Sequence, residues 1–184
     1  MRKIVLVYGT IAGLILGAMW FISAPLWDKG IITFDNGMFV GYATMVVALS
    51  LVFFGVKTYR DNHQNGKITF GRAFKVGILI TLIASVLYAF WWEIAIRTVS
   101  KGFSEEIQKH YVLKIREKAK DEGKNEAEVQ IEIDQVKKEF ELYENPIVRF
   151  GYTLIEILPV GLIITLLSSL LLKRNNFLPP TEPA

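Results

Sequence analysis

The chain divides into four long apolar segments and one highly charged segment, residues 93–149. Three of the apolar segments contain no Asp, Glu, Lys or Arg, and the fourth contains only Glu156. The four segments are Ile4–Trp27, Gly37–Val56, Val76–Trp92 and Phe150–Leu172. Because about 20 apolar residues of helix cross the hydrocarbon core of a bilayer, each segment can span a membrane alone. We therefore predict an all-α, polytopic membrane protein with four transmembrane helices.

The first apolar segment also follows a Met-Arg-Lys start, which is typical of a signal peptide. A signal peptide has an apolar region of only about 7–15 residues, and this segment is longer. Pro25 directly follows Ser23-Ala24, the small-residue pair near its end, and disfavours cleavage there. We expect the segment to be retained as the first span.

Basic residues predict the orientation of the spans. Arg2 and Lys3 precede the first span, Lys173 and Arg174 follow the last, and the 57–75 connection is strongly basic. Cytoplasmic loops carry the excess of Lys and Arg, whereas long polar segments cross the membrane largely regardless of charge. We predict that both termini and the 57–75 connection are cytoplasmic and that the charged insert lies outside.

Tryptophans support this orientation. Trp20 and Trp27 lie near the end of the first span, and Trp91 and Trp92 end the third. If successive spans alternate in direction, all four indoles lie at one interface, where such amphipathic rings concentrate.

Small residues recur every four positions in three of the spans, which places them on one face of each helix. They are Gly9, Gly13 and Gly17 in the first span, Ala73, Gly77, Thr81, Ser85 and Ala89 in the third, and Gly161, Thr165 and Ser169 in the fourth. Such stripes let helix backbones approach closely in a membrane. They indicate packing within one four-helix bundle, with a homodimer seam as the alternative.

The charged segment predicts a pair of amphipathic helices over residues 101–144. Ser104 is a candidate N-cap, Gly123 suits the end of the first helix, and Asn125 with Glu128 forms a variant of the capping box. The apolar positions form one narrow stripe on each helix: Ile107, Tyr111, Ile115 and Ala119, then Val129, Ile133, Val136, Phe140 and Tyr143. We expect a hairpin closed on its own seam. The alternatives are a protein partner, a second copy bound through residues 104–143, or the lipid surface.

These patterns define the predicted organisation. Residues 1–97 and 146–174 form the four-helix transmembrane bundle, residues 98–145 form the helical hairpin inserted between the third and fourth spans, and residues 175–184 form a short disordered tail.

Glu156 is the one ionisable side chain well inside a span, about 9 Å below the outer boundary if helical rise is counted from Phe150. An intramembrane acid is by default a functional candidate, such as a proton or cation relay. The alternative is a structural carboxyl that accepts a hydrogen bond from a neighbouring hydroxyl or pairs with Arg97 or Arg149. Pro159 removes the hydrogen bond to the carbonyl of Ile155 and predicts a kink in the same span.

On the predicted cytoplasmic side, Tyr59, Arg60 and Arg72 are candidates for contact with anionic lipid head groups. Orientation by the positive-inside bias explains the same charges without any ligand.

Motifs for chemistry are not recognisable. His63 and His110 are predicted on opposite sides of the membrane, and the serines in the spans have no His or Lys at the same depth to activate them. Nucleotide-binding glycine patterns and nucleic-acid-binding patterns are also missing from the sequence. Cysteine is absent, which excludes disulfides and thiolate sites. We therefore expect a protein that is not an enzyme, with no catalytic, cofactor or metal site, no nucleic-acid partner and no identified small-molecule substrate.

Three segments resemble a bacterial membrane family, domain-of-unknown-function family 4199. They are Phe53-Phe-Gly-Val-Lys-Thr-Tyr-Arg-Asp61, Ile68-Thr-Phe-Gly-Arg-Ala-Phe-Lys-Val-Gly77 with the apolar run to Tyr88, and Pro159-Val-Gly-Leu-Ile-Ile-Thr165 with the run to Leu172. The resemblance covers essentially the whole chain and implies a four-span protein of the bacterial inner (plasma) membrane. The family supplies no catalytic residues.

Together these observations favour a structural, accessory or partner-binding role through the hairpin outside the membrane. The alternative is a small oligomeric transporter or channel-like subunit in which Glu156 faces a polar path.

Overall fold

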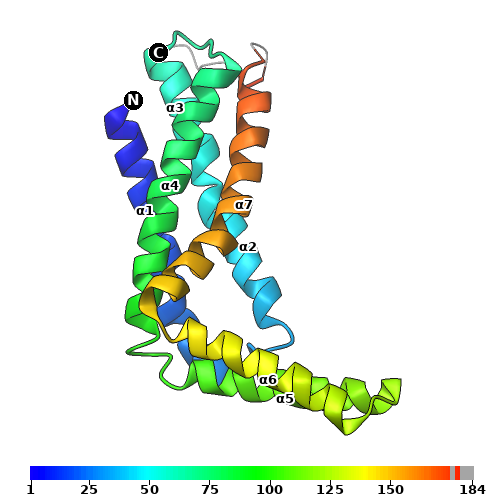
Figure 1. Cartoon of the computed structure of the whole chain (residues 1–184). Coiled ribbons are helices and arrows are strands. Elements are labelled where there is room, and N and C mark those ends of the chain that lie inside the picture. Colours follow the sequence, from blue (N-terminus) through cyan, green and yellow to red (C-terminus); the bar gives the residue numbers. More distant parts are fainter. Residues whose placement is uncertain (175–176, 179–184) are drawn as a thin grey trace.

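The computed structural model describes residues 1–174 and 177–178, and these residues form helices joined by short turns (Figure 1). The helices are α1 (Arg2–Asp28), α2 (Gly37–Leu49), α3 (Leu51–His63), α4 (Phe70–Ala95), α5 (Phe103–Glu122), α6 (Glu126–Tyr143) and α7 (Pro146–Leu172). Four helical stretches are long and apolar enough to cross a membrane: α1, α2 with α3, α4, and α7. The predicted all-α fold with four spans is confirmed. The predicted tail 175–184 lies outside the described residues except for Phe177 and Leu178.

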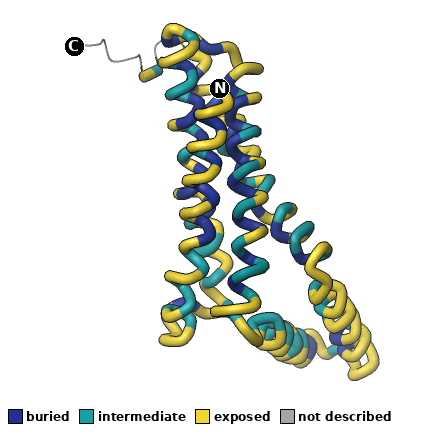
Figure 2. Tube along the Cα trace, turned by 90° about the vertical axis from the view of Figure 1, so that its left-hand side faces the viewer, coloured by how far each residue is buried: buried dark blue, intermediate teal, exposed yellow. Residues whose placement is uncertain are grey.

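Helix α4 lies at the centre of the bundle and packs against α1, α3 and α7. Glycines of α1 make the α1–α4 contact possible, because a Cβ on Gly13 would lie 2.6 Å from the Cβ of Leu87. In the α4–α7 contact, a Cβ on Gly161 would lie 2.2 Å from Thr81 Cγ2. The small-residue stripes therefore serve packing within one chain, as predicted. Figure 2 shows the resulting line of buried residues along the interior of the bundle.

The second span is one helical rod with an interruption at Ser50, which separates α2 from α3. Ser50 keeps helical dihedral angles, and its hydroxyl donates to the carbonyl of Val47 at 2.6 Å. This bond competes with the backbone ladder and bends helices. In Figure 1, α2 leans away from α1 and α4 toward the hairpin end. The span also extends to His63, beyond the predicted end at Val56.

Helix α7 contains the predicted Pro159 and changes direction along its length (Figure 1). Its first turn begins at Pro146, and the side chain of Asn145 accepts a hydrogen bond from the backbone N–H of Ile147 at 2.9 Å. Asn as N-cap followed by Pro at the first helical position is a favoured start, because Pro has no N–H to leave unsatisfied there.

Helices α5 and α6 lie side by side and run at a steep angle to the four spans, beyond the outline of the bundle (Figure 1). We call this pair the hairpin. Its small core consists of Ala119, Val129 and Ile133, with Val112 and Ile115 packed against them. Both hydrogen bonds of the Asn125–Glu128 capping box are present.

The predicted N-cap of α5 is wrong. Ser104 lies inside α5, and the N-cap is Gly102, whose φ of 81° is left-handed. Glycine has no Cβ to oppose that conformation, so the chain turns there and the helix starts before Ser104. Gly123 ends α5 with φ 65°, also left-handed, as a C-terminal glycine does.

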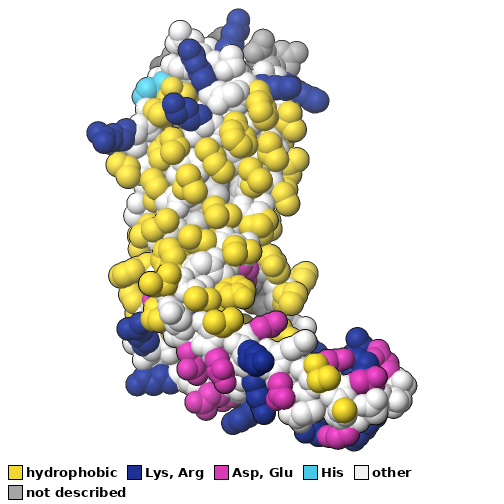
Figure 3. All heavy atoms as spheres, in the orientation of Figure 1, with side chains coloured by type: hydrophobic (Ala, Val, Ile, Leu, Met, Phe, Trp, Pro, Cys, Tyr) yellow, Lys and Arg dark blue, Asp and Glu magenta, His cyan; other side chains and the backbone are white. Residues whose placement is uncertain are grey.

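The surface has three zones (Figure 3). On the face shown, hydrophobic side chains form a broad band over the spans, basic side chains gather at the end where α1 begins and α7 ends, and the hairpin end carries charges of both signs. The band is the part of the surface that suits lipid.

Candidate functional site

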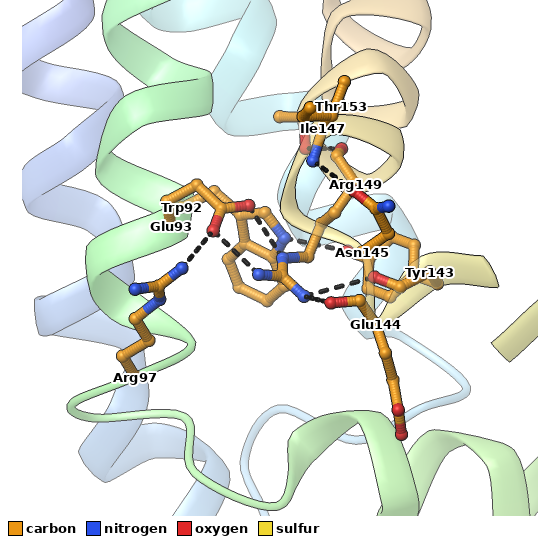
Figure 4. A network of polar contacts seen from close by, with 9 residues as sticks. All are labelled: Trp92, Glu93, Arg97, Tyr143, Glu144, Asn145, Ile147, Arg149 and Thr153. Carbon is orange, nitrogen blue, oxygen red and sulfur yellow. Dashed lines mark hydrogen bonds and ion pairs between the residues drawn. The ribbon is translucent and has the colours of Figure 1, made fainter. Parts of the chain in front are cut away.

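Glu93, at the end of α4, and Arg149, in the first turn of α7, form an ion pair where the hairpin joins the bundle (Figure 4). Arg149 Nε donates to Glu93 Oε1 and Nη2 to Oε2, each at 2.7 Å. Only 7% of Arg149 is exposed. A two-pronged Arg–carboxylate bond fixes both orientation and distance. The pair therefore holds the start of α7 against the end of α4.

Arg149 also binds the end of α6. Its Nη1 donates to the carbonyl of Tyr143 at 3.1 Å and to that of Glu144 at 3.3 Å. The last carbonyls of a helix have no partner within the helix, so the guanidinium satisfies them. One side chain thus ties together α4, α6 and α7.

Trp92 and Tyr143 form a second link at the same place. The indole Nε1 of Trp92 donates to the hydroxyl of Tyr143 at 2.8 Å. Burial raises the pKa of Tyr143 to about 12, with smaller contributions from the charges of Glu156 and Glu93, while the Trp92 bond and Arg149 act in the other direction. We call Trp92, Glu93, Tyr143 and Arg149 the junction.

Aromatic side chains attach α5 to α1 beside the junction. The ring of Phe103 lies 5.6 Å from Trp27 and 5.8 Å from Trp92, and Trp92 lies 4.2 Å from Trp20. Phe34, in the α1–α2 turn, stacks on His110 at 4.9 Å. Aromatic pairs at such distances contribute about 0.5–1.5 kcal/mol each beyond burial. The hairpin is therefore held at its base by polar and aromatic contacts together.

An exposed ion pair completes the attachment. Lys114 Nζ donates to Asp35 Oδ1 at 2.7 Å, and this hydrogen bond is the main cause that lowers the pKa of Asp35 and raises that of Lys114. Both groups are in solvent, so the pair adds little to stability.

Glu156 lies on α7, seven residues beyond Arg149, and is exposed on the isolated chain. Within the described residues no hydrogen bond holds it. The alternative in which Glu156 pairs with Arg97 or Arg149 is not what the structure shows, because both arginines contact Glu93 instead. Seven residues are two helical turns, so Glu156 lies about 10 Å further along α7 than Arg149.

The three candidates at the opposite end of the bundle, Tyr59, Arg60 and Arg72, differ in how far they are buried. Arg60 is 0% exposed. Its Nε donates to Asp61 Oδ1 at 2.7 Å, Nη1 to the carbonyl of Phe177 at 2.8 Å, and Nη2 to the carbonyl of Leu178. A lipid head group cannot reach the guanidinium in this arrangement. Arg60 instead holds the chain segment that follows α7.

Tyr59 and Arg72 lie nearer the surface. Tyr59 stacks on His63 with 5.4 Å between ring centroids. Arg72 is exposed and donates from Nη1 to Gln64 Oε1, across the α3–α4 turn. The three residues do not converge on one site.

The sequence interpretation missed Glu93 as a functional residue. The available signal was an acid at the end of one span and a base at the start of the next, on either side of a long insert. No cluster of three or more His, Asp or Glu side chains suited to a metal ion occurs in the part of the chain that the structure describes.

A family model described as "Protein of unknown function (DUF4199)" matches residues 7–174. The chain belongs to this family, as its resemblance indicated. No curated protein and no solved structure matches the chain.

Proposed function

We propose that this member of the DUF4199 family is a non-enzymatic protein of the bacterial inner membrane that presents its hairpin, outside the cytoplasm, to a protein partner. The observation that carries the proposal is the junction, which fixes a charged helix pair at a steep angle to the bundle. Both termini are cytoplasmic in this proposal, because basic side chains gather at the end of the molecule where α1 begins and α7 ends.

Chain connectivity does not require the hairpin. The α1–α2 connection spans residues 29–36 and the α3–α4 connection residues 64–69, whereas residues 96–145 separate α4 from α7. Short connections suffice between neighbouring helices. Fixing the long α4–α7 connection at its base also requires that the charges of Glu93 and Arg149 be buried. Desolvating such charges costs several kcal/mol per ion. A role that depends on the orientation of the hairpin explains this arrangement.

The hairpin surface offers apolar contacts among its charges. Leu113, Ile131 and Leu142 are each 59% exposed and lie outside the hairpin core. Apolar anchors surrounded by charged side chains are typical of binding surfaces, where the charges give specificity.

The experiment is site-specific photocrosslinking in native membranes. A crosslinking amino acid at Leu113 or Ile131 is expected to capture the same protein, and Ile163, an equally exposed residue of the bundle, serves as the control position. Replacement of Leu142 by Asp should reduce that capture about tenfold, as expected when an apolar anchor is lost. Capture of lipid alone, or of this chain alone, at both hairpin positions would contradict the proposal.

A second candidate function is that of a subunit in an oligomeric transporter. The observation that favours it is Glu156, an exposed acidic residue of a membrane-spanning helix, where acids usually face a polar path or a partner. In proteoliposomes with an imposed pH gradient, the wild-type protein should then dissipate the gradient faster than the Glu156→Gln variant. Rates equal to those of protein-free vesicles for both would exclude a proton path.

A further inference from the structure

A groove of about 610 Å³ lies between the end of α4 and the start of α7. Its apolar walls are Phe90 and Ile94 on α4 and Ile147 and Phe150 on α7. All four residues belong to membrane-spanning helices, and Ile147 is 83% exposed. The groove therefore opens sideways into the lipid rather than into water.

Arg97 and Thr98 line the end of the groove nearest the hairpin, and Phe90 and Phe150 line the end deeper in the bundle. This order follows from the direction of the helices, because α4 runs toward the hairpin and α7 runs away from it. Along the chain, the groove extends from Phe90 on α4 to Thr98 in the turn that follows the helix. A polar end at head-group depth and an apolar end at acyl-chain depth match one amphiphilic molecule.

The polar end carries a net positive charge. Both oxygens of Glu93 bind Arg149 at 2.7 Å, so that carboxylate is already neutralised. Arg97 reaches Glu93 Oε2 only at 3.5 Å, and 65% of its side chain is exposed. An exposed guanidinium favours a phosphate, which accepts from it in the same two-pronged manner as a carboxylate.

We propose that this groove binds one anionic glycerophospholipid, with an acyl chain between the walls of α4 and α7 and the phosphate on Arg97. The anionic class follows from the net positive charge of two arginines on one carboxylate, since a zwitterionic head group brings its own cation to the same place. The site is separate from Arg72 and the other basic residues at the opposite end of the bundle. It does not depend on a protein partner for the hairpin.

The test is native mass spectrometry of the full-length protein in mild detergent, equilibrated with phosphatidylglycerol or with phosphatidylcholine of the same acyl chains. We expect one phosphatidylglycerol per chain, retained in preference to phosphatidylcholine. Arg97→Gln should lower retention about fivefold, the effect of one basic contact to an anionic lipid. Ile147→Trp, which fills the groove, should lower it at least as much, and Arg97→Lys should lower it less than Arg97→Gln.

Matched controls separate the groove from general lipid contact. Lys109→Gln removes an exposed cation from the hairpin, and Ile163→Trp enlarges an exposed side chain of α7 outside the groove. Both should retain lipid as the wild type does. Equal retention by Arg97→Gln and Lys109→Gln would overturn the phosphate contact, and equal retention by Ile147→Trp and Ile163→Trp would overturn the groove. Equal binding of the two lipids would overturn the anionic preference, and a dimer that Ile147→Trp dissociates would show a second copy in the groove.

Discussion

The two ends of the bundle are each closed by a buried arginine, and the two arginines find their partners in different ways. Arg149 pairs with Glu93, an acid from another span, whereas Arg60 pairs with Asp61, its neighbour in the chain. Both arginines also donate hydrogen bonds to backbone carbonyls. Arg149 donates to those of Tyr143 and Glu144, and Arg60 donates to those of Phe177 and Leu178. The ion pair of Arg149 therefore specifies tertiary structure, while the ion pair of Arg60 forms locally and only its carbonyl contacts are tertiary.

The comparison predicts that Glu93→Gln has the largest effect on stability. It leaves the guanidinium of Arg149 buried without a carboxylate, and breaking a buried pair in this way costs about 3–5 kcal/mol. Thermal unfolding of the purified full-length protein, followed by circular dichroism, measures the loss. Arg97→Gln is the matched control, because it removes the exposed cation that touches the same carboxylate. Equal stability of the two variants would show that the junction does not hold the hairpin end together.

Arg60→Met should lower the free energy of unfolding by about 2 kcal/mol, less than Glu93→Gln does. The apolar replacement keeps most of the volume, and Asp61 keeps its contact with Lys57 at 2.7 Å, so the loss is mainly that of charged hydrogen bonds to the two carbonyls. The same unfolding measurement applies, with the exposed Arg72→Met as control. A loss of stability as large as that caused by Glu93→Gln would contradict the distinction between a local and a tertiary ion pair.

Tyr143→Phe should change how stability depends on pH. Because the pKa of Tyr143 is raised from 10.0 to about 12 in the folded protein, its contribution is complete below pH 10 and is lost as the pH rises toward 12. The wild type should therefore lose more stability than Tyr143→Phe over this window, by about 2 kcal/mol. Unfolding in guanidinium chloride at a series of pH values measures the difference. Parallel profiles would mean that the hydroxyl is exposed and the junction is open.

Lys114→Gln should have the smallest effect on stability. Its ion pair with Asp35 lies in solvent, where such contacts contribute little. The unfolding midpoint should stay within error of the wild type in low and in high salt. A clear drop at low salt only would show that the hairpin depends on this contact and not on the junction alone.

Much of the fold could be predicted because it follows from local patterns. The absence of charge over long segments identifies the spans, the four-residue recurrence of Gly13 and Gly17 identifies the packed face, and Asn145-Pro146 identifies the start of α7. Each signal depends on neighbours within a few residues or on the solvent around one helix.

The candidate site could be predicted only in part. The sequence suggests Glu156 as a partner for Arg149, and only the crossing of α7 over the end of α4 selects Glu93 instead. Arg60 stands between Lys57 and Asp61 in a segment that reads as an exposed basic surface, and it is buried because Phe177 and Leu178 fold back over it. Such choices depend on residues far apart in the chain, which a local pattern does not contain.

Only Glu144 and Asn145 separate α6 from α7. This two-residue connection is too short for the hairpin to move independently of the first turn of α7. A sideways pull on the tip of the hairpin is consequently delivered as a turning force to the first turns of α7, with the Glu93–Arg149 bond as the pivot. The compliant point lies further along, where Pro159 lacks its backbone hydrogen bond. A force on the hairpin would thus change the tilt of the first turns of α7, the segment that carries Glu156.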